Sequence, residues 1–81
     1  MADPVRDLVS LALATPDPGR VSNWLVAYLG TRPHDAKLSA LKKLELDLGK
    51  GAWAPPERRA VDMIVRVIQK LSGNLASGGR K

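Results

Sequence analysis

The longest amphipathic stretch of the chain lies between Pro55 and Leu71. Read as a helix at about 100° per residue, its apolar side chains fall on one continuous face that spans roughly 200°. These side chains are Ala60, Val61, Met63, Ile64, Val65, Val67, Ile68 and Leu71. A helix that packs against one neighbour needs an apolar stripe only a little wider than ~100°. The pattern therefore predicts a helix that other elements surround, or one that shares its face with a second copy or a partner.

Three shorter upstream segments also repeat apolar residues at helical spacing. The repeats are Val5, Leu8, Val9, Ala12 and Leu13, then Val21, Trp24, Leu25, Tyr28 and Leu29, then Leu38, Leu41, Leu44 and Leu48. The run from Leu44 to Leu48 also alternates as a strand would. We favour a helix there, because the run has no β-branched residue and the chain offers no second strand to pair with it.

Prolines and glycines punctuate these segments. Prolines stand near the start of each, with Asp3 and Asp17 placed as N-caps in the first two, and such positions favour helix starts. Gly30, Gly49 and Gly73 follow three segments, where a helix commonly ends. The sequence predicts helices at about residues 4–14, 18–29, 33–48 and 55–72. It also predicts a mobile tail at 74–81 that is dispensable for folding.

These elements predict one all-α domain, a compact bundle of four helices with the 55–72 helix at its centre. Eighty-one residues are too few for two independent cores. A hydrophobic content of 44% is enough for one. We expect the core to contain Trp24, Leu25, Tyr28, Leu41, Ile64 and Ile68.

Composition narrows the setting. The chain has no cysteine, which excludes disulfides and sulfur-bound zinc. Small secreted domains usually carry disulfides, so we expect a cytoplasmic protein. No apolar run approaches the ~18 residues that span a membrane. The apolar N-terminal stretch is interrupted by Arg6 and Asp7, unlike a signal peptide.

Candidate chemistry is sparse. His34 is the single histidine, and no serine lies at a suggestive spacing from it. The acidic residues do not form a calcium-loop pattern. The segment Gly49-Lys50-Gly51 lacks the spacing of a phosphate-binding loop. We therefore expect no enzyme, no metal, no cofactor and no small-molecule substrate.

Charge offers one functional reading. The formal net charge is +5, and eleven of the thirteen Lys and Arg residues lie in residues 31–81. Seven of them form a candidate basic stripe on the third and fourth helices: Lys42, Lys43, Lys50, Arg58, Arg59, Arg66 and Lys70. Such a stripe can neutralise nucleic-acid phosphates, or it can simply be solvated. Gln69 is the single Asn or Gln of the 55–72 helix, so a contact of this kind would be independent of base sequence.

Protein binding explains more of the apolar pattern. The fourth helix is apolar over a wide arc, and Leu46 lies off the main stripe of its own helix. Contiguous exposed apolar patches mark interaction sites, whereas a central helix can also use its whole arc inside the bundle. We predict a small non-catalytic regulatory protein that binds a protein partner or itself. The predicted interface residues are Leu46, Met63, Val67 and Trp53, and nucleic-acid binding is the alternative.

Overall fold

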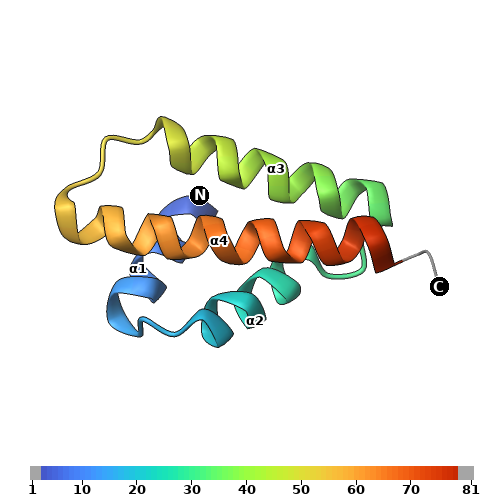
Figure 1. The fold of residues 1–81 in the computed structure, drawn as a ribbon, viewed down its shortest axis with the longest axis horizontal. Helices are drawn as coiled ribbons and strands as arrows, with labels where there is room; N and C mark the ends of the chain where they lie inside the picture. Colours follow the sequence, from blue (N-terminus) through green and yellow to red (C-terminus); the bar gives the residue numbers. More distant parts are fainter. Residues whose placement is uncertain (1–2, 79–81) are drawn as a thin grey trace.

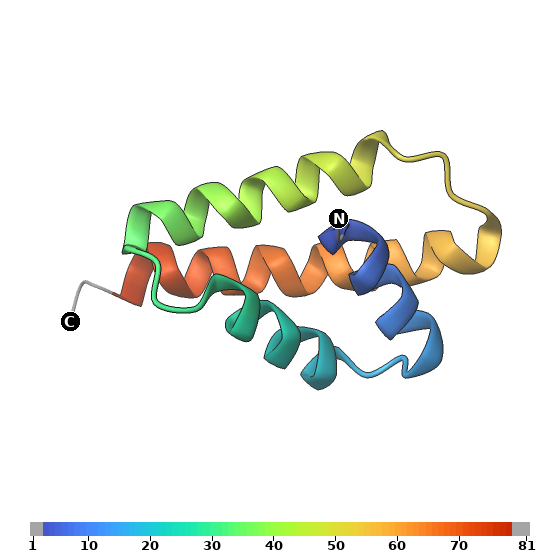
Figure 2. The same ribbon diagram turned by 180° about the vertical axis from the view of Figure 1, so that it is seen from behind.

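The chain folds around its longest helix, α4 (Pro55–Gly78). Three shorter helices precede it: α1 (Pro4–Ala14), α2 (Pro18–Leu29) and α3 (His34–Lys50). All three pack against α4. In Figures 1 and 2, α3 and α2 flank α4 on opposite sides. This computed structural model describes residues 3–78, with side chains as far as Ala76, and over that range it confirms the predicted bundle of four helices.

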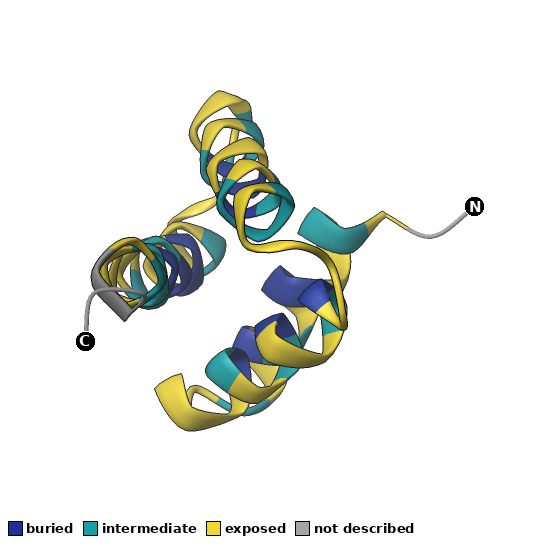
Figure 3. Ribbon diagram, turned by 90° about the vertical axis from the view of Figure 1, so that its right-hand side faces the viewer, coloured by how far each residue is buried: buried dark blue, intermediate teal, exposed yellow. Residues whose placement is uncertain are grey.

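The core lies where the apolar stripes of the helices meet, and Figure 3 shows the buried residues on their inward faces. Leu25, Leu41, Ile64 and Ile68 are each 0% exposed, as predicted. Completely burying a side chain of this size contributes about 1.5–3 kcal/mol. Helix α4 supplies both of the isoleucines, which supports its predicted central place.

Two residues predicted for the core, Trp24 and Tyr28, are only half-buried. They stack on each other at the edge of the core, with ring centroids 5.2 Å apart. The guanidinium of the exposed Arg32 lies 5.0 Å from the centroid of the Tyr28 ring. An indole N–H and a phenol O–H need polar partners, and an edge position leaves both within reach of water.

The helix starts follow the predicted capping pattern. Oδ1 of Asp3 accepts a hydrogen bond from the Val5 amide at 3.1 Å, and Oδ1 of Asp17 accepts one from Gly19 at 3.0 Å. Each cap is followed by a proline at the first helical position. Pro33 itself is the N-cap of α3, so that helix begins one residue later than predicted.

The glycine stops were predicted correctly only at Gly30, which caps α2 with a φ of 58°. Helix α3 continues through Gly49 to Lys50, and α4 continues through Gly73 to Gly78. Leu75 explains the longer α4, because it lies one turn beyond Leu71 and packs against the core. That contact outweighs the cost of a helical glycine, about 1 kcal/mol. The predicted tail therefore does not begin at residue 74, and residues 79–81 lie outside the described residues.

The two glycines inside helices predict a gain of stability. A Cβ at Gly49 or Gly73 would meet no atom within 4 Å apart from the adjoining residues and the backbone of its own helix. Gly49→Ala and Gly73→Ala should each raise the free energy of unfolding by about 0.5–1 kcal/mol in urea denaturation. Gly30→Ala is the matched control and should lower it, because its backbone is left-handed. A loss of stability in either of the first two variants would contradict this placement of α3 and α4.

The end of α4 predicts a loss of stability on truncation. Removing the residues after Gly73 deletes Leu75 and should cost about 1–2 kcal/mol, since Leu75 is half-buried. Thermal melting should show a fall of several degrees, at about 4–8 °C per kcal/mol. Leu75→Ala in the full chain should reproduce most of the fall, and Leu75→Met should not. An unchanged melting temperature after truncation would mean that Leu75 adds nothing to the core.

Candidate protein-binding furrow

A furrow runs along α4 on the side that faces α1 and α2. It consists of three adjoining hollows of about 180, 420 and 250 Å³. Arg59 and Met63 line both the first and the central hollow, and Val67 and Lys70 line both the central and the third. The α4 residues along it run from Pro56 to Asn74, which is about 27 Å of helix. We call this feature the α4 furrow.

The base of the α4 furrow is apolar. Met63 and Val67 line its central hollow, and both are half-buried against the core. The residues that line the opposite wall are uncharged and come from α1, α2 and the segment between them: Ala12, Leu13, Pro16, Pro18, Gly19 and Ser22. Leu13 remains 46% exposed. The furrow therefore offers apolar surface that the fold itself leaves partly uncovered.

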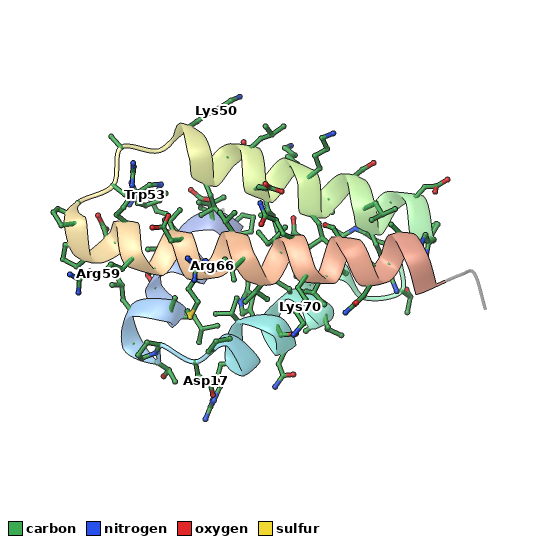
Figure 4. The ribbon with its side chains drawn as sticks, viewed as in Figure 1. Asp17, Lys50, Trp53, Arg59, Arg66 and Lys70 are labelled. Atoms are coloured by element: carbon green, nitrogen blue, oxygen red, sulfur yellow. The ribbon has the colours of Figure 1, made fainter. Side chains whose placement is uncertain are left out.

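A row of cations forms the α4 rim of the central hollow: Arg59, Arg66 and Lys70. Their spacing places them within about 40° of one another around the helix. Figure 4 shows the three along α4, with Asp17 on the α2 side. Asp62 is the one anion among the residues that line this hollow. The rim therefore carries a net positive charge above an apolar base, and we call Arg59, Arg66 and Lys70 the cation row.

The structure separates Leu46 from the other predicted interface residues. Leu46 is 56% exposed on α3, two residues from the buried Leu44 and from the buried Leu48. Two residues correspond to about 200° of helix, so Leu46 faces away from the core. The hydrogen bond from Gln69 to Glu45 joins α3 to α4 on a different side from Lys70 and the furrow. Leu46, Met63 and Val67 thus do not form the single patch that the sequence suggested.

Trp53 anchors the segment that connects α3 to α4, which we call the link. Its indole Nε1 donates a hydrogen bond to the Leu48 carbonyl oxygen at 2.8 Å, and the ring packs against the core. A Cβ at Gly51 would lie 2.5 Å from the indole, so the ring needs glycine there. Trp53 lines a separate hollow of about 280 Å³, which shares only Leu13 with the α4 furrow. This predicted interface residue therefore lies outside the furrow and holds the link in place.

The seven predicted cations do not form one stripe either. Lys43 lines a hollow between α1, α2 and α3 together with Asp3 and Asp47. The remaining three, Lys42, Lys50 and Arg58, are exposed and line none of the three hollows of the furrow. Only the cation row gathers at one site.

Sequence reasoning missed the opposite wall of the furrow. Leu13 belongs to the α1 stripe, and Pro18 served only as a helix-start signal. Both line the furrow because α1 and α2 dock beside α4, which is a tertiary contact. No local pattern in the sequence could have identified them.

The described residues offer little for other kinds of site. Among them, no three His, Asp or Glu side chains lie close enough to hold a metal ion. In the same part of the chain, no helix is both long and apolar enough to cross a membrane. Since a fold alone does not fix a function, a function has to be inferred from the chemistry of the furrow. Comparisons with protein-family models, with curated proteins and with solved structures found no match to this chain.

Proposed function

We propose that this protein is a non-catalytic interaction protein that holds a segment of a partner protein in the α4 furrow. The observation that supports this is the central hollow of about 420 Å³, which has Met63 and Val67 at its base and the cation row at its rim. Partly uncovered apolar surface with a polar border is typical of protein-binding sites.

The dimensions of the α4 furrow suit a helical segment. Its length of about 27 Å matches a helix of about 18 residues at 1.5 Å per residue. In helix-in-groove binding, apolar side chains at i, i+3 or i+4 and i+7 enter the groove. Leu13, Met63 and Val67 are spread along the furrow and could receive such a stripe.

Charge argues against a second copy of the chain as the occupant. A two-fold symmetric pairing places the same surface on both sides of the interface. Two cation rows would then lie within one interface, and Asp62 is the one anion among the residues that line each central hollow. Like charges brought together in this way disfavour association. We therefore favour a different protein over self-association.

Phosphate contact explains the site less well. The candidate cations on α3 lie apart from the cation row, and Lys43 shares its hollow with two aspartates. Affinity for a nucleic-acid backbone depends on the number of phosphates neutralised. The apolar side chains at the base of the furrow neutralise none of them. Nucleic acid is accordingly the alternative that the experiment below must exclude.

The chain contains a convenient reporter of the furrow, because Met63 is its only methionine besides Met1. We propose to label the methionine methyl groups with ¹³C and assign the Met63 signal with a Met63→Leu variant. The probe is a helical peptide of about 18 residues that carries a leucine stripe and uncharged flanks. The Met63 methyl signal should shift saturably as this peptide is added.

Leu46→Asp is the matched control and should leave the titration unchanged, because Leu46 faces away from the core. A peptide that binds without shifting Met63, or that fails to bind, would contradict the proposal. A concentration-dependent shift of the free chain would indicate self-association instead. A response to duplex DNA that exceeds the response to the peptide would favour the alternative.

A further inference from the structure

We infer that the occupant of the α4 furrow is an amphipathic helix with Asp or Glu along one edge of its apolar stripe. This inference rests on the proposed function, and it specifies the chemistry of the partner. It follows from the charges of the furrow walls, the spacing of the cation row and the charges on the helices of the chain itself.

The cation row is unpaired within the described chain. Arg59, Arg66 and Lys70 are all exposed, and none forms an ion pair with a carboxylate of the described residues. Asp62 lies one turn before Arg66, yet the two side chains do not meet as an ion pair. The three charges are therefore available to a partner.

The two walls of the furrow differ in charge. The cation row lies on the α4 wall, whereas the residues of α1, α2 and the segment between them that line the hollows are uncharged. Asp17, the one anion of that segment, is exposed and lines none of the three hollows. A helix docked between them would need carboxylates only on the edge that faces α4, and apolar or neutral residues on the other edge. Complementary charge of this kind favours the correct partner and orientation.

The spacing of the cation row sets a register. From Arg59 to Lys70 the helix rises about 16 Å, and the three cations stand at i, i+7 and i+11. Acidic residues at the same spacing on a partner helix would form a row of equal length. The leucines or other large apolar residues of the partner would then face Met63 and Val67.

The chain itself offers no helix of this kind among the described residues. Helix α1 carries one cation, Arg6, and one anion, Asp7. Helix α3 has a leucine stripe, but its lysines outnumber its acidic residues. The described helices therefore do not supply an acidic edge, and we assign it to a partner protein.

A displayed peptide library tests this inference on the full chain. The library consists of helices of about 18 residues with a fixed leucine stripe, and each flanking position is drawn from Glu, Gln and Lys. Selection should enrich Glu on one edge at i, i+7 and i+11 if the peptide runs parallel to α4, or at i, i+4 and i+11 if it runs antiparallel. Selection on the Arg59→Glu, Arg66→Glu double variant should enrich Lys at the two of those positions that are seven residues apart.

Binding of one selected peptide should then be measured directly. Replacing its acidic residues with Gln should weaken affinity about tenfold at low salt, and the difference should shrink as salt screens the charges. Pro18→Glu places a carboxylate on the uncharged wall at the first residue of α2, where a helix start tolerates it. This variant should weaken binding of the acidic peptide more than binding of its Gln counterpart.

The outcomes separate this inference from the proposed function. In one outcome the peptides show no charge preference, still bind the Arg59→Glu, Arg66→Glu variant and fail to bind Met63→Asp. This outcome would overturn the inference of an acidic edge and would leave the proposed binding in the furrow intact. Failure to enrich any peptide would overturn both, as would binding that survives Met63→Asp. Tighter binding to duplex DNA than to the acidic peptide, with Met63→Asp tolerated, would also overturn both. Circular dichroism of each variant confirms that it is folded, and Pro18→Glu supplies a readout that leaves the core unchanged.

Discussion

Ile64→Ala should lower the free energy of unfolding by about 2–5 kcal/mol, the range for truncating a buried isoleucine. Ile64 is 0% exposed on α4, the helix against which the other three pack. A small domain has a total stability of about 5–15 kcal/mol, so this one change would remove a large share of it. Urea denaturation followed by circular dichroism measures the effect.

The matched control for this change lies two residues away on the same helix. Arg66→Ala alters an exposed side chain and should change stability by no more than about 0.5 kcal/mol. A loss below about 1 kcal/mol for Ile64→Ala would mean that helix α4 is not the centre of the core.

Met63→Asp combined with Val67→Asp should weaken capture of a furrow-bound helix by at least about a hundredfold. Apolar anchors at the centre of an interface each contribute about 2 kcal/mol or more, and every 1.4 kcal/mol corresponds to a factor of ten. Two new carboxylates at the base of the furrow would also repel an acidic occupant. The measurement is a peptide titration followed by fluorescence anisotropy.

Stability must be followed in parallel, because Met63 and Val67 are half-buried. We expect a weakened but folded chain, since Ile64 and Ile68 keep their places in the core. Val26→Asp with Leu46→Asp is the control pair: both side chains are 56% exposed, and neither lines the furrow. If the furrow variant unfolds while the control pair stays folded, the wide apolar arc of α4 serves the core, and the proposed interface loses its main support.

Local signals predicted most of the fold. Asp3 and Asp17 each cap a helix that begins with proline, and this short-range chemistry is visible in the sequence. The apolar stripes placed Leu25, Leu41, Ile64 and Ile68 in the core because one face of each helix has to be buried. The helix ends were harder, since Gly73 would stop α4 only if nothing beyond it packed, and Leu75 does.

The candidate site was less predictable than the fold. Periodicity identified Met63 and Val67 as part of an unusually wide face, and it placed Arg59, Arg66 and Lys70 in one row. It could not show that these five residues line one hollow, because the docking of α1 and α2 decides that. Leu46 illustrates the same limit. The sequence does not show which helix packs against α4 beside Met63, because that depends on the tertiary fold.

The anchored link between α3 and α4 also affects the order in which the protein folds. Trp53 ties the link to Leu48, and Oε1 of Glu57 accepts a hydrogen bond from the Ala54 amide at 3.1 Å. Contacts between neighbouring segments form early because little loop entropy is lost in closing them. We expect the α3–α4 hairpin to form first and α1 with α2 to dock onto it afterwards. The α4 furrow lies where α1 and α2 dock beside α4 in that late step. A partner helix bound in the furrow would therefore contact the part of the protein that forms last, and it would slow the local unfolding of that part.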